Sequence, residues 1–364
     1  MSHYVFHEQA DLTLTKFKEL LGQGVVRTID LGGHTLECPE GEVVCLSREM
    51  AVSNGTIQCA GFRQRLFGRR NSVSTLLVGL RIKGNRCKLD SVTVTGLGGD
   101  SVAVVVDKAE GVQLIDCTIT GNEGTGLMVF GRGATAIVRN GRCTRNRRSG
   151  LVAMAGGRCL AQGLEADDNG TGVTCFLEGS VVAMENGSLE NNRTNGAFVF
   201  GGGVMKLSGV RVADNGGEGA AAWDVGTLLE LEDQCEITRN GGYGLHAARG
   251  AQVLVSGALG LEANVKGSMR EATRGEILGA ESRGKPGVIS ANSAISVIPR
   301  GPAQYMSSRS IAPEPGASTA DTIRKLEIEG RAESSVGGAR SLRHDTTLDN
   351  GAADDAPETS EAHS

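Results

Sequence analysis

The sequence predicts an all-β solenoid, in which the chain winds into stacked coils of short parallel strands. Three observations predict it. A segment of 22 to 25 residues repeats between residues 111 and 251, apolar residues alternate within each repeat, and 54 of the 364 residues are glycine. Collagen is excluded, because glycine does not recur every third residue and there are only 7 prolines. A wholly disordered chain is excluded by the regular Val, Leu and Ile of the first 267 residues.

Six repeats align on one glycine and on one asparagine that precedes it. Because asparagine tolerates left-handed backbone angles, and because amides one coil apart can hydrogen-bond, we interpret the asparagines as a structural ladder. Asn264 opens a further repeat. The glycines are Gly126, Gly150, Gly172, Gly196, Gly219 and Gly244, and the asparagines are Asn122, Asn146, Asn169, Asn192, Asn215 and Asn240.

The residues after each glycine alternate with the period of a strand, as in residues 126–130. A unit this small cannot bury its own apolar face, but coils stacked about 4.8 Å apart can bury it together. We therefore predict two inward columns. They consist of Leu127, Leu151, Val173, Ala197, Ala220 and Leu245, and of Val129, Ala153, Cys175, Val199, Ala222 and Ala247.

Two segments near the start add a resemblance to a known family. The segments RTIDLGGHTLECP (27–39) and MAVSNGTIQCAG (50–61), together with the repeats, resemble the first coils of the pectin-lyase-like superfamily. The resemblance covers about residues 25–267 and implies a right-handed parallel β-helix. It selects no activity, because this solenoid hosts lyases, hydrolases, epimerases and non-catalytic interaction modules.

The N-terminal residues 1–24 are expected to cap the solenoid. Residues 12–21 place Leu14, Phe17 and Leu21 on one helical face, with Asp11 as the N-cap. Such a helix would cover the open end of the core.

The C-terminal residues 268–364 are expected to form a low-complexity, mostly disordered tail. Residues 301–364 are rich in Ser, Ala, Gly, Glu and Asp, and the last 20 contain no Lys or Arg. A short helix is predicted at 319–331. The solenoid itself is expected to occupy residues 25–267.

Charge and cysteine content restrict the classes of partner and compartment. Thirty-seven Lys and Arg against 42 Asp and Glu provide no basic field for nucleic acid. The chain has no apolar stretch of about 18 residues and no signal peptide at its start, so we expect no membrane partner and a cytoplasmic location. The nine cysteines form no CxxC pair, which favours reduced, buried thiols over a zinc site or disulfides. No cofactor is predicted.

The catalytic signatures of this fold are mostly missing. A pectin hydrolase would resemble an NTD, DD, GHG and RIK series, but here RIK (81–83) precedes Asp167-Asp168, and GHG and NTD are absent. A calcium-dependent lyase would need carboxylates on neighbouring coils, which Asp167 and Glu190 supply, with Asn191 beside them and Arg193 or Arg211 nearby. Solvated turn residues are the alternative interpretation of this pair.

An aromatic pattern on the outward positions is the main candidate for a binding site. Following the inward pair, one column reads Phe130, Met154, Phe176, Phe200, Trp223 and Ala248, and the other reads Met128, Val152, Thr174, Phe198, Ala221 and His246. If these residues face solvent, they form an apolar stripe of the kind that marks a binding site. The alternative is that the rings turn inward at a corner and stack in the core. The predicted partner-binding residues are Phe130, Phe176, Phe198, Phe200 and Trp223.

Two arginine clusters suggest a basic ridge for an acidic partner, with solvated charge as the alternative. One comprises Arg142, Arg145, Arg147 and Arg148, and the other comprises Arg63, Arg65, Arg69 and Arg70.

These observations predict a non-catalytic recognition module that binds a protein or glycan partner along an exposed face. The alternative function is a carbohydrate-active enzyme, a polysaccharide lyase or glycoside hydrolase, that acts on acidic polysaccharide. Only the fold favours this alternative.

Overall fold

The computed structural model describes residues 2–59, 77–232 and 234–272, and the short strands at 276–278, 281–282 and 288–290. The chain divides into a compact unit from Met1 to Ala312 and a second unit from Pro313 to Ser364. The second unit, the predicted helix at 319–331 and the arginines at 63–70 lie outside the described residues.

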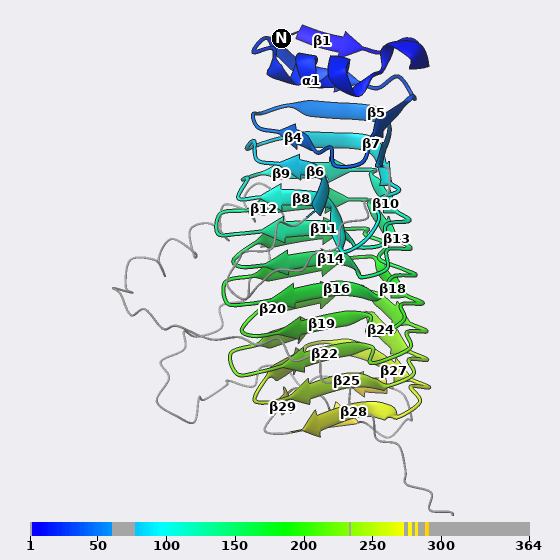
Figure 1. Cartoon of the computed structure of the whole chain (residues 1–364). Coiled ribbons are helices and arrows are strands. Elements are labelled where there is room, and N and C mark those ends of the chain that lie inside the picture. Colours follow the sequence, from blue (N-terminus) through cyan, green and yellow to red (C-terminus); the bar gives the residue numbers. More distant parts are fainter. Residues whose placement is uncertain are drawn as a thin grey trace, which may run out of the picture. The chain divides into compact units, whose positions relative to one another are not determined.

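The first unit is a parallel β-helix, in which successive coils lie one below the other (Figure 1). Its strands form three sheets that run along the stack. Sheet 1 contains β1 (Ser2–Val5), β2 (Val26–Asp30), β3 (Thr35–Cys38), β5 (Ala51–Cys59), β7 (Lys88–Thr95), β9 (Val112–Ile115), β10 (Thr118–Thr120), β12 (Thr135–Arg139), β13 (Arg142–Thr144), β15 (Arg158–Gln162), β17 (Val181–Glu185), β20 (Val204–Ser208), β23 (Leu228–Leu231), β26 (Gln252–Val255) and β29 (Glu276–Leu278).

The remaining strands form two further sheets, of which sheet 3 begins only at β18 (Ser188–Glu190). Sheet 2 contains β4 (Val44–Leu46), β6 (Leu77–Ile82), β8 (Ser101–Asp107), β11 (Thr125–Phe130), β14 (Ser149–Met154), β16 (Thr171–Phe176), β19 (Ala197–Phe200), β22 (Ala220–Trp223), β25 (Tyr243–Ala248) and β28 (Gly267–Ala272). Sheet 3 contains β18 (Ser188–Glu190), β21 (Arg211–Ala213), β24 (Cys235–Thr238), β27 (Ala258–Glu262), β30 (Glu281–Ser282) and β31 (Val288–Ser290). Among the strands that the structure describes, all pairs are parallel except the two that β31 makes with β27 and β30.

The predicted inward columns form the core. Leu127, Leu151 and Val173 pair in register on successive strands of sheet 2, and the pairing continues through Ala197 and Ala220. Every member of both columns is fully buried in one continuous apolar cluster. Each coil therefore depends on its neighbours to remove its apolar side chains from water.

The ladder asparagines are buried and bonded from coil to coil. In five of the six steps from Asn122 to Asn264, Nδ2 donates to Oδ1 of the next asparagine at 2.8 to 3.1 Å. In the step from Asn169 to Asn192, the backbone N–H of Asn169 donates to Oδ1 of Asn192 at 2.8 Å. Nδ2 of Asn215 also donates to the carbonyl of Leu189. These bonds satisfy polar groups that would otherwise be costly to bury.

The left-handed backbone angle of this turn lies one position earlier than the sequence suggested. The residue before each asparagine has positive φ, and the ladder asparagines do not. The asparagine must direct its amide into the stack, so its predecessor reverses the chain instead. These predecessors are Gly121, Arg145, Asp168, Asn191, Asp214, Arg239 and Ala263.

The repeated glycine is required by the ladder. A Cβ at Gly126 would lie 2.8 Å from Nδ2 of Asn146 and 2.7 Å from the carbonyl oxygen of Gly150. A Cβ at Gly150 would lie 2.7 Å from Nδ2 of Asn169. Real Cβ atoms are not found so close to backbone oxygens, so the asparagine of one coil selects glycine in the preceding coil.

The N-terminal cap contains the predicted helix with a different N-cap. Helix α1 (Leu14–Gly22) begins after Thr13, whose Oγ1 accepts a hydrogen bond from the N–H of Lys16, whereas Asp11 belongs to a 3₁₀ turn, η1 (Gln9–Asp11). Asp11 was therefore the wrong N-cap, because only Thr13 stands next to the first helical residue. The helix buries Phe17 and Leu20.

Strand pairing continues beyond the predicted end of the solenoid at residue 267. Strand β28 pairs with β25, and β29 pairs with β26. Regular coils therefore reach Leu278, and most of the predicted tail lies outside the described residues. Within the described part of the chain, no helix is long and apolar enough to cross a membrane.

Candidate functional site

The predicted partner-binding aromatics lie on the outer face of sheet 2. Phe130 packs against an outer apolar cluster that includes Met128 and Val152 and is separate from the core. Phe198 and Phe200 flank the core residue Val199, so strand alternation points them away from the core. The alternative that these rings stack inside the solenoid is wrong. We call Phe130, Phe176, Phe198, Phe200 and Trp223 the aromatic row, and all five are half-buried.

The rings of the row stack on one another. Because parallel strands pair in register, Phe176 and Phe200 meet with centroids 5.0 Å apart and planes 3° apart. Phe198 stacks on Phe200 at 4.8 Å, and its ring meets Trp223 edge-on at 5.0 Å. Four of the five rings thus cover part of one another, and Phe130 packs instead against the outer cluster of Met128 and Val152.

The row has a polar boundary at its N-terminal end. Arg81 and Asp107 form an ion pair of 2.6 Å, and the Asp107 carboxylate is buried. Arg81 belongs to the RIK segment (81–83) that resembled a hydrolase motif. Its guanidinium pairs with Asp107 on the neighbouring coil, so the arginine has a structural role.

Sequence reasoning missed a polar cluster at the C-terminal end of the row. The ring of His246 lies 6.0 Å from the ring of Trp223 and 6.1 Å from that of Tyr243. Nδ1 of His246 lies 3.4 Å from Oε1 of Glu218. The alignment contained a signal for it, because Glu218 and Tyr243 both directly precede a repeated glycine and therefore occupy neighbouring coils.

The Glu218 carboxylate is stabilised within this cluster. Burial by itself raises its pKa, but the side chain of His246 and the backbone N–H of Tyr243 outweigh burial, so the pKa of Glu218 lies below its usual value. Nε1 of Trp223 and Nε2 of His246 are buried with no hydrogen-bond partner among the described residues, and Nδ1 of His246 has the 3.4 Å contact with Glu218. The His246 side chain is nine-tenths buried.

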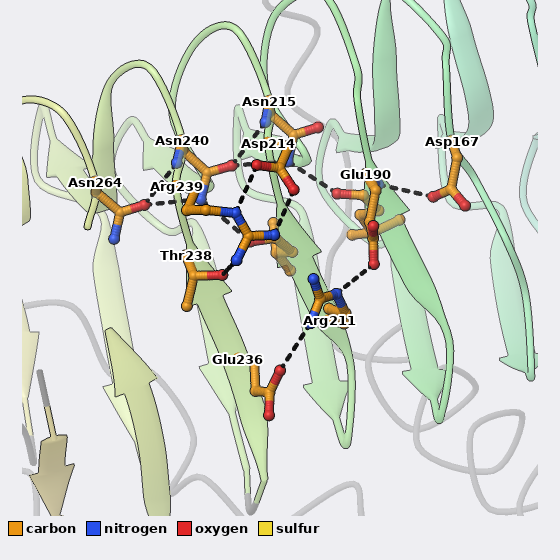
Figure 2. Close-up of polar contacts among 12 residues, drawn as sticks. Asp167, Glu190, Arg211, Asp214, Asn215, Glu236, Thr238, Arg239, Asn240 and Asn264 are labelled. Carbon is orange, nitrogen blue, oxygen red and sulfur yellow. Dashed lines mark hydrogen bonds and ion pairs between the residues drawn. The ribbon is translucent and has the colours of Figure 1, made fainter. Parts of the chain in front are cut away.

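The proposed calcium pair, Asp167 and Glu190, lies in a network of charged residues on and beside sheet 3 (Figure 2). Asp167 accepts hydrogen bonds from Oγ of Ser188 and the N–H of Glu190, both at 2.7 Å. Burial raises the pKa of Asp167, while these two bonds oppose the rise. Glu190 accepts from Nε of Arg211 at 2.6 Å, and Arg211 also contacts Glu236 at 3.2 Å.

In this network most of the carboxylates pair with arginine side chains of the same chain. Figure 2 shows Arg211 between Glu190 and Glu236, and Arg239 against Asp214. No group of three or more His, Cys, Asp or Glu side chains within the described residues is arranged to hold a metal ion. Of the two arginines expected near the pair, Arg211 contacts it, whereas Arg193 donates to the carbonyl of Arg147.

Two of the four arginines in the cluster at 142–148 have acidic partners. Arg142 pairs with Glu165 at 2.7 Å, and Arg148 pairs with Asp100 at 2.7 Å. Surface pairs of this kind contribute at most about 1 kcal/mol each, and here they offset the charge of two of the four arginines in the cluster.

All nine cysteines are free, and eight of them are buried. Burial raises the pKa of the Cys117 thiol to about 11 and that of Cys175 to about 12. These thiols remain protonated at neutral pH and act as small apolar side chains.

Comparison with known proteins identifies the fold. Residues 78–233 match the family model described as a right handed beta helix region. The crystal structure of pectate lyase Pel9A aligns with a TM-score of 0.51 and 14% identity, over 72% of this chain and 73% of that chain. A mutant of the periplasmic alginate epimerase AlgG aligns with a TM-score of 0.50 and 14% identity, over 69% of this chain and 74% of that chain.

No curated protein sequence matches the chain significantly. Identities of 14% establish the fold alone. The strand topology, the family model and these two structures agree with one another. The chain is a right-handed parallel β-helix repeat protein with a pectin-lyase-like fold.

Proposed function

We propose that this chain is a non-catalytic recognition module that binds a protein partner through the aromatic row. The observation that carries the proposal is the stacked, half-buried row of rings on the outer face of sheet 2. Binding energy in protein interfaces is concentrated in a few aromatic anchors, and a contiguous apolar surface is typical of such sites.

Ring geometry favours a protein over a glycan as the partner. A pyranose packs against the open face of an aromatic ring, but Phe176 and Phe200 cover each other with planes 3° apart. The guanidinium of Arg249 lies 5.1 Å from the centre of the Trp223 ring and occupies that face. Ring edges and methyl groups instead suit the apolar side chains of a protein.

The test compares the intact chain with the variant F198S/F200S/W223S in affinity capture, followed by direct binding measurements with the purified captured protein. We expect at least a tenfold loss of affinity, because each anchor contributes about 2 kcal/mol or more. Leu254→Ser is the matched control, since Leu254 is a half-buried outward residue on sheet 1. Equal affinity of the triple variant and the intact chain would disprove the proposal. Selective binding of the intact chain to purified neutral glycans would show that the partner is a glycan and not a protein.

A carbohydrate-active enzyme acting on acidic polysaccharide is the second candidate. It is supported by the fold shared with a pectate lyase and an alginate epimerase, and by the raised pKa of Asp167 beside Glu190 and Arg211. Incubation with polygalacturonate and with alginate, with and without calcium, tests it by the release of unsaturated products or by a change in uronate composition. Activity that Asp167→Asn abolishes would favour the enzyme.

We further propose that the protein acts in the cytoplasm. Nine cysteines without a disulfide are typical of a reducing compartment, because disulfides form and persist in oxidising ones. Localisation of the tagged full-length chain tests this.

A further inference from the structure

Two arginines are positioned at the C-terminal end of the aromatic row. The guanidinium carbon of Arg249 lies 5.1 Å from the centre of the Trp223 ring, and that of Arg270 lies 5.5 Å from the centre of the Tyr243 ring. His246 lies between the two rings. Stacking on an aromatic ring orients a guanidinium and leaves its N–H edge available to a planar acceptor such as a carboxylate.

Glu218 and Asp224 lie beside this end of the row and engage His246 and Arg249 rather than Arg270. Glu218 is engaged by the N–H of Tyr243 and by His246, and Lys266 also contributes a positive charge to its surroundings. Asp224 forms an ion pair with Arg249 at 3.7 Å, so part of the charge of Arg249 is compensated. Arg270 is exposed and has no acidic partner among the described residues.

A second observation concerns buried donors at the same place. Nε1 of Trp223 carries a hydrogen and has no acceptor among the described residues, and Nε2 of the nine-tenths buried His246 has no hydrogen-bond partner there either. Buried polar groups without partners are rare in native structures, and each requires an explanation. A ligand acceptor that enters between Arg249 and Arg270 would supply one.

Arg270 continues one of the two outward columns of sheet 2, and Arg249 follows the last residue of β25. Phe198, Ala221, His246 and Arg270 occupy one outward column on four successive strands of sheet 2. From Phe130 to Trp223 the row crosses four coil steps, about 19 Å, which is the length of about six extended residues. A peptide segment lying along the row would therefore reach the arginines with its next residues.

We propose that Arg249 and Arg270 bind a carboxylate of an extended peptide whose apolar residues lie on the aromatic row. This inference rests on the proposed function and specifies the partner as an apolar segment followed by Asp, Glu or a C-terminal carboxylate. The row supplies apolar contact, and the arginines determine which end of the peptide lies at β28.

The experiment uses the full chain and two synthetic peptides that alternate Leu and Ser over six residues. One peptide ends in two Asp residues, and the other ends in two Asn residues with a blocked terminus. Calorimetry measures affinity, and Trp223 reports binding locally, because it is the only tryptophan of the chain. The variants are Arg249→Gln and Arg270→Gln, with Arg132→Gln as the matched exposed control and Phe200→Ser as the row variant.

The acidic peptide should bind the intact chain at least tenfold more tightly than the Asn peptide and should change the Trp223 emission. Arg249→Gln and Arg270→Gln should each remove most of this preference, whereas Arg132→Gln should keep it. Equal affinity for the two peptides, with loss of both in Phe200→Ser, would overturn the carboxylate site and leave the row as a binding surface.

The opposite result separates the two proposals. Arginine-dependent binding of the acidic peptide that Phe200→Ser does not weaken would support the carboxylate site and count against the row. Absence of binding by both peptides would overturn the inference. Arginine-dependent binding of an oligouronate, but not of the acidic peptide, would assign the carboxylate to a sugar and overturn the peptide proposal.

Discussion

Gly219 and Asn240 fit against each other across one coil step: a Cβ added to Gly219 would lie 2.8 Å from Nδ2 of Asn240. The same amide donates to the carbonyl of Val212 and to Oδ1 of Asn264. It therefore cannot move away without breaking bonds within the ladder.

Gly219→Ala should destabilise the protein by about 1 to 3 kcal/mol, because the methyl group would overlap the carbonyl of Gly244 and the Asn240 amide. Chemical denaturation measures the change. Gly24→Ala is the control, since a Cβ there meets nothing within 4 Å. Similar stability of the two variants would show that the ladder does not select glycine.

Asn192→Ala should cost about 2 to 4 kcal/mol of unfolding free energy, because it removes the acceptor of the Asn169 N–H and the donor to Asn215. Asn191→Gly, one residue earlier, should be neutral or stabilising, since Asn191 has φ of 55° and glycine adopts this angle without strain. Thermal melts of the two variants provide the comparison. A larger loss in Asn191→Gly than in Asn192→Ala would contradict it.

The position of the aromatic row predicts a modest effect on stability. Phe200→Ser should lower the unfolding free energy by about 1 kcal/mol, because the ring is only half-buried. Leu245→Ala in the inward column should cost about 2 to 5 kcal/mol, since Leu245 is fully buried. A loss in Phe200→Ser as large as that in Leu245→Ala would mean that the ring supports the fold.

Glu218 should contribute a pH-dependent stability. Its pKa in the folded protein lies below the ordinary value of 4.5, so the unfolded chain binds its proton more readily. The stabilisation is complete above about pH 4.5 and is lost as the pH falls through the folded pKa. Melting curves of the intact chain and Glu218→Gln should therefore converge on acidification below pH 4.5. A constant difference across that range would exclude this linkage.

Much of the architecture could be predicted, because every coil of a solenoid must satisfy the same packing and pairing requirements. The spacing of Asn146, Asn169 and Asn192 predicted both the ladder position and the inward columns, since every coil must meet the next in register. The backbone conformation of the turn was harder to predict from the sequence. Arg145 and Arg239 adopt left-handed angles although arginine shows no preference for them, because the buried amide that follows leaves no other place for the reversal.

The candidate site was predictable only in part. Period-two alternation identified the columns of Phe198 and Phe200, but it could not show whether the last residue of a strand faces outward or turns a corner. Glu218 and His246 were harder to connect, because they come from different positions of neighbouring repeats. Their contact depends on side-chain packing around Trp223, which the sequence pattern does not contain.

The in-register stacking of sheet 2 also makes the molecule a spacer of adjustable length. Each coil added between them would place the Arg81–Asp107 pair and Arg270 about 4.8 Å further apart, and neither end would change. Gain or loss of one whole repeat would therefore change the length of partner that fits between the two ends. The asparagine ladder and the apolar core would still pair in register across the new junction. A single-residue deletion would instead shift the ladder asparagine out of line, so changes in reach are expected to come in steps of one coil.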